Sequence, residues 1–259
     1  MPDGFGDGRI SSETRQPEPL EGTRRRLGEG ALSKYDRQLI VDGFRLDSER
    51  QRARFLTAKA NAAIPPLPTS TALLPRAGVA GYASNRYQLH AGLSPLTGRS
   101  RIYLIGHGSW KNQTLGGDTP QTWVTTLVEG GIPAVDLISI TGCQAGRDAG
   151  SSDDMRVTEG ANSFASQFHQ LLGDAGIKVK VYARAYKVRI RSGGAQGSVG
   201  QKFTEGVHHR ERSKILFYWE GGQQRRKWVD YGATDDPNTW LDVDDWAEQA
   251  GFIAALMAL

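Results

Sequence analysis

Two residues of this chain, His107 and Cys143, combine reactive side chains with matching positions in the sequence. Each lies one glycine beyond a short apolar run, Ile102–Ile105 for the histidine and Leu137–Thr141 for the cysteine. A thiolate attacks carbonyl carbon well, and an adjacent imidazole can accept the thiol proton and later protonate a leaving amine. The spacing therefore predicts nucleophilic catalysis by a Cys–His pair.

Both residues also have an ordinary structural interpretation. A lone cysteine at a strand end usually packs as a small apolar residue. Cys143 departs from that pattern because it lies between glycine and Gln144, outside the apolar run. Neighbouring glycines let the backbone turn sharply, and we expect the N–H groups around Gly108 and Cys143 to bind an oxyanion. Spacing alone leaves catalysis and packing both open.

The elements around this pair predict an α/β sandwich. Short, wholly apolar runs are typical of strands buried on both faces of a parallel sheet, whose carboxyl ends are where ligands bind. Further strands are expected at Tyr35–Val41, Tyr87–Leu93, Val179–Ala185, continued by Tyr186–Arg191, and Lys214–Trp219. Helices are expected at Asp47–Ala63, Thr122–Glu129 and Asn162–Gly173.

Length and composition restrict the class of protein. A chain of 259 residues suits one domain with tails or two small domains. No apolar run approaches the roughly 18–20 residues of a membrane span, and no signal-peptide core is visible. The single cysteine excludes an intramolecular disulfide, argues against a cysteine-based zinc site and fits a reducing compartment. We expect a soluble protein without a metal.

The net charge of +4 conceals a strong segregation of charge. Residues 178–227 hold 13 Lys and Arg against 3 Glu, a balance of +10. Residues 228–259 hold 6 Asp and 1 Glu without Lys or Arg, a balance of −7. Such a pattern concerns binding partners and not the fold; we expect no nucleic acid among them, although it is the competing partner for a basic protein.

Six segments together resemble a known family, the self-cleaving cysteine protease domain of large bacterial toxins. That family comprises the multifunctional-autoprocessing RTX type and the large clostridial type, within the caspase-like clan. The segments are SKYDRQLIV (33–41), LIGHG (104–108), NQTLGG (112–117), ISITGCQAG (138–146), YKVRIRSGG (186–194) and SKILFYWE (213–220). They occur in the family's order and cover residues 33–221, whereas residues 51–100 show no clear match.

The resemblance implies a caspase-like sandwich with a central, mostly parallel sheet flanked by helices and a C-terminal β-flap. The protease domain is expected at residues 33–227. Composition predicts a flexible leader before it (1–32), and the residue spacing after it predicts an acidic tail with an amphipathic helix (228–259) that has no counterpart in the family. The resemblance makes Cys143 the nucleophile and His107 the general base and acid. An acidic residue after the first strand orients the histidine in some members, and Asp47 is the nearest match.

The resemblance also implies a polyphosphate activator, inositol hexakisphosphate, bound at a basic site remote from the active site. Lys187, Arg189 and Arg191 alternate onto one face of their strand, which favours anion binding, although a solvent-facing strand shows the same alternation. Lys214 joins them because it and Arg189 have basic counterparts in the family. Further candidates are Arg101, Arg184 and Lys202. The segment after the flap glycine, GGAQGS (193–198), lacks the family's basic residues.

The family cuts its own chain after a leucine, N-terminal to the protease domain. The leader offers Leu20, Leu27 and Leu32, and Leu27 is favoured because Gly28 follows it. We therefore expect a bacterial toxin or effector, secreted without a visible signal peptide, that acts in a host cytosol. The alternatives are a catalytically silent caspase-like scaffold and a basic nucleic-acid binder, although no nucleic-acid-binding module is recognisable.

Overall fold

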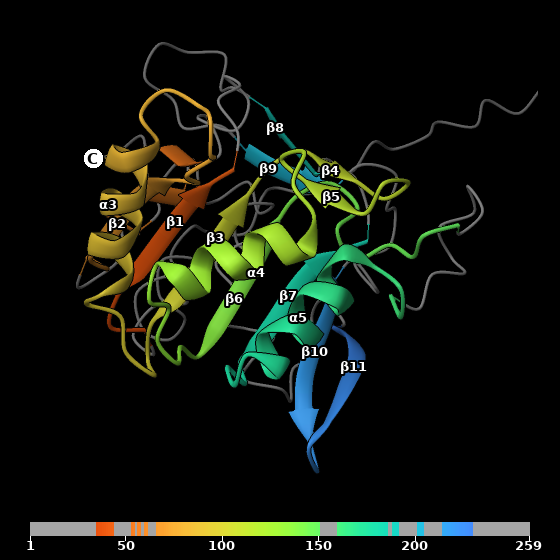
Figure 1. Cartoon of the computed structure of the whole chain (residues 1–259). Coiled ribbons are helices and arrows are strands. Elements are labelled where there is room, and N and C mark those ends of the chain that lie inside the picture. Colours follow the sequence, from red (N-terminus) through yellow and green to blue (C-terminus); the bar gives the residue numbers. More distant parts are fainter. Residues whose placement is uncertain are drawn as a thin grey trace, which may run out of the picture.

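The computed structural model describes residues 35–43, 53–54, 56–57, 60–61, 66–150, 160–185, 188–191, 201–204 and 214–229 (Figure 1). Its central sheet is built from β1 (Gln38–Asp42), β2 (Thr69–Leu73), β3 (Arg101–Ile105), β6 (Leu137–Thr141), β7 (Lys180–Arg184), β10 (Lys214–Glu220) and β11 (Gln223–Val229). These seven strands lie in the order β11-β10-β7-β6-β3-β1-β2. The pairs among β2, β1, β3, β6 and β7 are parallel, and β10 and β11 add an antiparallel edge.

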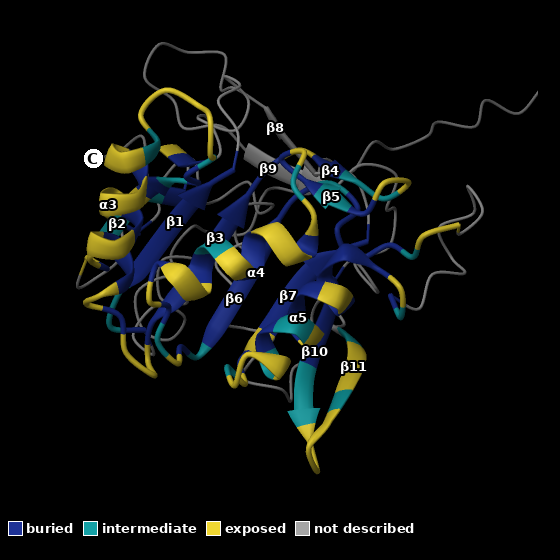
Figure 2. Cartoon of the chain, viewed as in Figure 1, coloured by how far each residue is buried: buried dark blue, intermediate teal, exposed yellow. Residues whose placement is uncertain are grey.

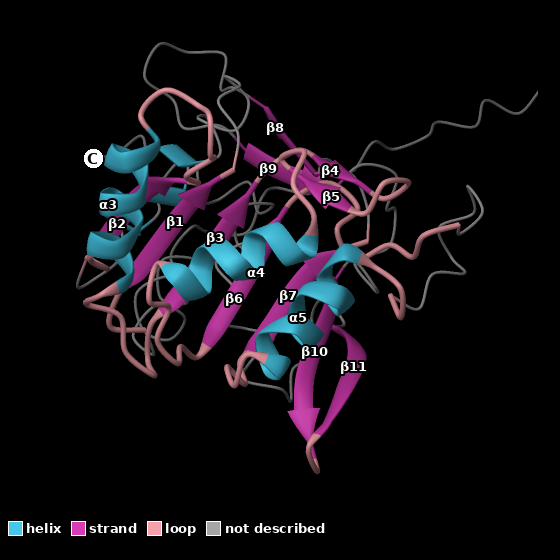
Figure 3. Ribbon diagram, in the orientation of Figure 1, coloured by secondary structure: helices cyan, strands magenta, loops and turns pink. Residues whose placement is uncertain are grey.

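Three helices connect the parallel strands: α3 (Tyr82–Leu93), α4 (Pro120–Glu129) and α5 (Phe164–Asp174). All three pack on the same face of the sheet (Figure 3). The side chain of Thr119 accepts a hydrogen bond from the N–H of Thr122 at the start of α4, and Ser163 caps α5 in the same way. The fold is therefore α/β with a mostly parallel sheet, consistent with the predicted caspase-like sandwich.

The two faces of the sheet differ in character. The helix-covered face is apolar, with Leu39, Ile102 and Ile138 buried against Trp123 of α4 and Phe168 of α5. The opposite face, which we call the polar face, carries Gln38, Arg101, Tyr103, Ser139, Arg184 and Lys214, as the strand registers require. All of these residues are buried, and β1, β3 and β6 stay dark along their length in Figure 2.

Helical residues also lie against the polar face. Residues 53–54, 56–57 and 60–61 are helical, within the predicted helix Asp47–Ala63. The carbonyl of Leu56 accepts a hydrogen bond of 3.4 Å from the Gln38 amide, and Ala60 packs with Leu137 and Tyr182. Among the described helices, none is long and apolar enough to cross a membrane.

Two sequence predictions were wrong. The expected strand Tyr87–Leu93 is part of α3, because Asn85, Leu89 and Leu93 recur every four residues on one buried face. The expected continuation of the Val179–Ala185 strand does not occur, since β7 ends at Arg184, where its pairing with β10 also ends. Instead β8 (Val188–Arg191) pairs with β9 (Gln201–Thr204) in a separate two-stranded sheet.

Two strands of the central sheet were not predicted. β2 forms the edge next to β1. β11 pairs with β10 across Gly221 and Gly222, which have φ values of 58° and 78°. Positive φ at both central residues is the geometry of a tight β-hairpin, which glycine adopts readily.

Candidate active site

The site lies at the carboxyl edge of the sheet, where β3 and β6 end side by side. Ile105 and Thr141 are register partners, and His107 and Cys143 each follow two residues later. His107 is exposed and Cys143 is half-buried. The expectation that these strands are neighbours is confirmed, and the loops that carry the two residues leave the sheet together.

Backbone atoms of the two loops are in direct contact at Gly108. A Cβ at this position would lie 1.9 Å from the carbonyl oxygen of Cys143, 2.9 Å from its carbonyl carbon and 3.0 Å from its nitrogen. Only glycine permits this approach. The two residues predicted to supply oxyanion donors, Gly108 and Cys143, therefore touch through their main chains.

The segment after His107 is a short hairpin, formed by β4 (Gly108–Ser109) and β5 (Thr114–Leu115). The N–H of Gly116 donates a hydrogen bond of 2.8 Å to the His107 carbonyl and closes the hairpin. The indole N–H of Trp123 donates one of 2.8 Å to the Leu115 carbonyl. These bonds fix the hairpin to α4, and through it the backbone of His107.

Arg76 joins the hairpin to the end of β1. Its Nε donates to the Asp118 carboxylate at 2.8 Å, and its Nη2 donates to the same carboxylate at 2.5 Å. The same Nη2 donates to the Gly43 carbonyl at 2.5 Å and to the Gly116 carbonyl. One guanidinium thus connects three backbone segments on the side of His107 that faces away from Cys143.

A second arginine joins the hairpin to the loop of Cys143. The Arg147 guanidinium lies over the Trp110 ring, 3.9 Å from its centroid. The Gln113 amide donates to the carbonyls of Trp110 and Arg147 at 2.5 Å and 3.2 Å. In the described part of the chain, Gln113 and Gln144 are the non-glycine residues with positive φ, at 50° and 56°. Strained backbone in both loops is typical of sites where geometry serves function.

The loop of Cys143 is also attached to β7 and α5. The N–H of Gly146 donates a hydrogen bond of 2.8 Å to the Arg184 carbonyl, and the N–H of Ala165 donates one of 3.0 Å to the Ala145 carbonyl. The Asp148 carboxylate accepts from the N–H of Gly160 at 2.8 Å and from that of Asn162 at 2.7 Å. The position of Cys143 is therefore linked to the end of a strand that carries a basic residue on the polar face.

The predicted His-orienting residue, Asp47, lies outside the described residues. An acidic residue that the structure places at this edge is Asp42, the last residue of β1, which is buried. Asp42 is the register partner of Ile105, two residues before His107. Sequence reasoning passed over it although it directly follows the apolar run of the first strand.

The predicted cation site divides into three parts. Arg184 and Lys214 are direct register partners on the polar face, and each is only 2% exposed. Arg101 is on the same face but two strands away, in register with Lys180, which precedes Arg184 by four residues. Ideal strand spacings put Arg101 about 16 Å from Arg184. The third part lies in β8 and β9, which contain Arg189, Arg191 and Lys202, whose side chains are outside the described structure. Lys187 lies outside the described residues, and so do Leu27 and Gly28 of the predicted cleavage site.

Arg101 has an unusual buried environment. Its Nε and Nη2 donate to the Gln38 side-chain oxygen at 2.9 Å and 2.5 Å. The guanidinium lies between the rings of Tyr35 and Tyr103, at 4.7 Å and 4.9 Å from their centroids. Its Nη1 is buried without a hydrogen-bond partner in the described structure. On β10, at the other part of the polar face, the Lys214 ammonium lies 5.8 Å from the Tyr182 ring centroid.

The described residues contain no group of three His, Cys, Asp or Glu side chains that could hold a metal ion. Residues 73–199, which include His107 and Cys143, match the model of the Peptidase C80 family. This match supports a cysteine peptidase.

No curated protein matches the chain. Among solved structures, a metagenomic carboxyl esterase is similar at 18% identity over 67% of this chain and 56% of its own, with a TM-score of 0.24. A similarity that weak carries no argument about fold or function.

Proposed function

We propose that this protein is a cysteine endopeptidase of the caspase-like clan, related to the self-cleaving protease domains of bacterial toxins. The observation that carries the proposal is the backbone contact between Gly108 and Cys143, which joins the histidine loop to the cysteine loop at the carboxyl edge of the sheet. The Peptidase C80 match over the same segment supports it.

In the proposed reaction, His107 takes the thiol proton of Cys143, and the thiolate attacks the carbonyl carbon before the scissile bond. A C–S bond forms, and the N–H groups of Gly108 and Cys143 stabilise the tetrahedral oxyanion. The C–N bond then breaks, and the leaving amine takes the proton from His107. Water, deprotonated by His107, hydrolyses the thioester and restores the thiol.

We further propose inositol hexakisphosphate as the activator, bound at the polar face. Arg184 and Lys214 are buried register partners on this face, and a guanidinium and an ammonium group both form charge-assisted hydrogen bonds with phosphate. Arg101 has a buried guanidinium nitrogen without a hydrogen-bond partner in the described structure, but its distance of about 16 Å from Arg184 makes it a weaker candidate. Lys187, Arg189, Arg191 and Lys202 remain predicted contributors.

A route from this site to the nucleophile runs through one hydrogen bond. The Arg184 carbonyl accepts from the N–H of Gly146, in the loop that begins at Cys143. A ligand that draws the Arg184 side chain toward itself also moves this carbonyl. Activation requires that the ligand bind the active form better than the dormant one, because equal affinity for both shifts nothing.

The proposed substrate is the chain's own leader, cut between Leu27 and Gly28, in a bacterial toxin or effector that acts in a host cytosol. The test is to incubate the pure protein with and without inositol hexakisphosphate and to sequence any new N-terminus. We expect a ligand-dependent product that begins at Gly28. Equal cleavage without the ligand would refute activation, and a cut at Leu20 or Leu32 would refute the cleavage site.

Charge at the polar face is tested separately. Lys214→Met removes the charge and keeps the length of the buried side chain, so we expect a higher ligand concentration for half-maximal cleavage. Lys178→Met, at an exposed position before β7 and at the opposite end of that strand from Arg184, is the matched control and should leave that concentration unchanged. A folded protein that neither cleaves nor reacts with a thiol probe under any condition would favour the catalytically silent scaffold, and salt-dependent binding of nucleic acid would favour the third alternative.

A further inference from the structure

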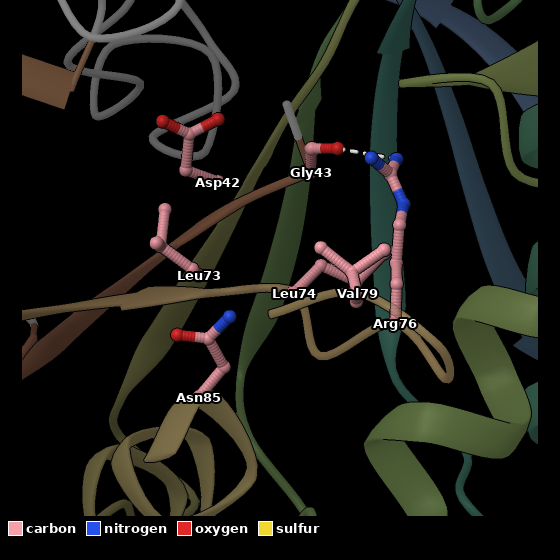
Figure 4. Close-up of a pocket in the computed structure, with 7 residues that line it drawn as sticks. All are labelled: Asp42, Gly43, Leu73, Leu74, Arg76, Val79 and Asn85. Carbon is pink, nitrogen blue, oxygen red and sulfur yellow. Dashed lines mark hydrogen bonds between the residues drawn. The ribbon is translucent and has the colours of Figure 1, made fainter. Parts of the chain in front are cut away.

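A pocket of about 230 Å³ opens at the carboxyl ends of β1 and β2, outside the contact between Gly108 and Cys143 (Figure 4). Its walls are mainly apolar, formed by Leu73, Leu74 and Val79, and Asn85 of α3 closes one side. Asp42, Gly43 and Arg76 complete the lining. The volume suits one medium-sized aliphatic side chain.

The strand registers fix where this pocket lies relative to the reactive residues. Leu73, Asp42, Ile105 and Thr141 form one row of register partners across β2, β1, β3 and β6. His107 follows the β3 member of the row, and Cys143 follows the β6 member. Along this edge the pocket therefore comes first, the histidine second and the cysteine third.

The chemistry of a thiol peptidase determines in which direction a bound substrate chain runs along that row. The leaving amine receives its proton from the imidazole, so the substrate segment after the scissile bond must lie on the histidine side of the nucleophile. The pocket is on that side. Two strand spacings separate its centre from the midpoint between β3 and β6, about 10 Å. An extended peptide advances about 3.3 Å per residue, which brings the side chain of the second residue after the bond within reach.

We propose that this pocket is a specificity subsite for the second residue after the scissile bond, and that it selects an aliphatic side chain. The proposal rests on the cysteine peptidase function proposed above. The apolar walls disfavour an acidic occupant, because its carboxylate would lose water there without gaining hydrogen bonds from them. Arg76 holds the wall in place, because it binds the Gly43 carbonyl and the Asp118 carboxylate.

The subsite has a consequence for the leader. With a cut after Leu27, the second residue is Glu29, which is a poor occupant. Attachment to the same chain compensates for poor affinity, since a tethered substrate is present at a high effective concentration. A separate substrate has no such advantage, so the preference should appear clearly with free peptides.

The test uses synthetic leader peptides that keep Leu27 and Gly28 and carry Leu, Ala or Glu at position 29, cleaved by the ligand-saturated protein. We expect kcat/KM for the Leu peptide to exceed that for the Ala peptide by roughly 10–100-fold, as for apolar groups in a hydrophobic pocket. The Glu peptide should be the poorest. Equal rates for the three peptides would overturn the subsite and leave the peptidase intact.

Val79→Phe fills the mouth of the pocket from a position that is 39% exposed. It should lower kcat/KM for the Leu peptide to the level of the Ala peptide and so abolish the preference. Val128→Phe, on α4 at 41% exposure, is the matched control and should preserve the preference. A preference for Leu that survives Val79→Phe would overturn the proposal. Failure to cleave any peptide would refute the peptidase itself and the subsite with it.

Discussion

Gly108→Ala is the substitution that most directly disturbs the contact between the two reactive loops. The added Cβ would lie 1.9 Å from the Cys143 carbonyl oxygen, whereas ordinary contacts begin at 3.4 Å. About 1.5 Å must therefore be gained by moving one loop away from the other. The nearest atoms are all backbone atoms of Cys143, so no side-chain rotation can relieve the clash.

The expected effect on activity is larger than the effect on folding. Overpacking at one site costs about 1–3 kcal/mol of unfolding free energy. A displacement of about 1 Å between reacting groups costs roughly 100-fold in rate. We therefore expect Gly108→Ala to remain folded, with its turnover lowered by about 100-fold or more.

The assay measures the rate at which the protein cuts its leader in the presence of inositol hexakisphosphate, and urea unfolding measures the stability of each variant. Gly98→Ala is the matched control, because a Cβ there meets nothing within 4 Å and the backbone is outside the positive-φ region. This control should keep the wild-type rate. A folded Gly108→Ala protein with wild-type turnover would show that the contact with Cys143 has no catalytic importance.

Three further predictions concern other residues. His107→Ala should lower turnover by about 10²–10⁴-fold and slow alkylation of Cys143 at neutral pH, and unchanged alkylation would contradict the dyad. Arg76→Gln should lower kcat more than KM is raised, because the histidine hairpin loses its tie to β1; Arg86→Gln, whose ion pair with Glu129 is exposed and 3.9 Å long, should change neither constant. Burial lowers the pKa of His169 from 6.5 to about 4, and its Nε2 donates to the Val179 carbonyl. Because the unfolded state binds this proton first, stability is fully present above pH 6.5 and falls as the pH drops toward 4, by about 2 kcal/mol at pH 5. Urea unfolding at pH 7 and pH 5 should show a smaller loss in His169→Gln than in the wild type, and equal losses would contradict this assignment.

The strands at the centre of the sheet were predictable because their sequences are continuously apolar. Leu137–Thr141 was predicted with its observed bounds, and Ile102–Ile105 missed only Arg101 at its start. From these two strands alone follow the parallel pairing and the adjacent positions of His107 and Cys143. The prediction of a strand at Tyr87–Leu93 was wrong for the opposite reason, because the sequence of α3 has no strong apolar stripe. Tyr87, an aromatic residue of a type common in strands, is 74% exposed on this helix.

The residues that hold the site together could not be predicted from local pattern. Arg76 binds Asp118 across 42 positions, and the Gln113 amide reaches the Arg147 carbonyl across 34. Such contacts depend on which loops meet at the sheet edge, which the sequence alone does not specify. A signal for the buried cations did exist, because each lies at one terminus of a strand whose central residues are apolar or aromatic: Arg101 and Lys214 begin β3 and β10, and Arg184 ends β7.

The central claim is that Cys143 is the nucleophile of a peptidase. Its most direct test is covalent capture of the ligand-activated protein by a peptidyl chloromethyl ketone that ends in leucine, with the labelled residue located by mass spectrometry. We expect one label per chain on Cys143, and we expect Cys143→Ala to be folded, unlabelled and unable to cleave the leader. Cleavage retained by the folded Cys143→Ala protein would contradict the claim.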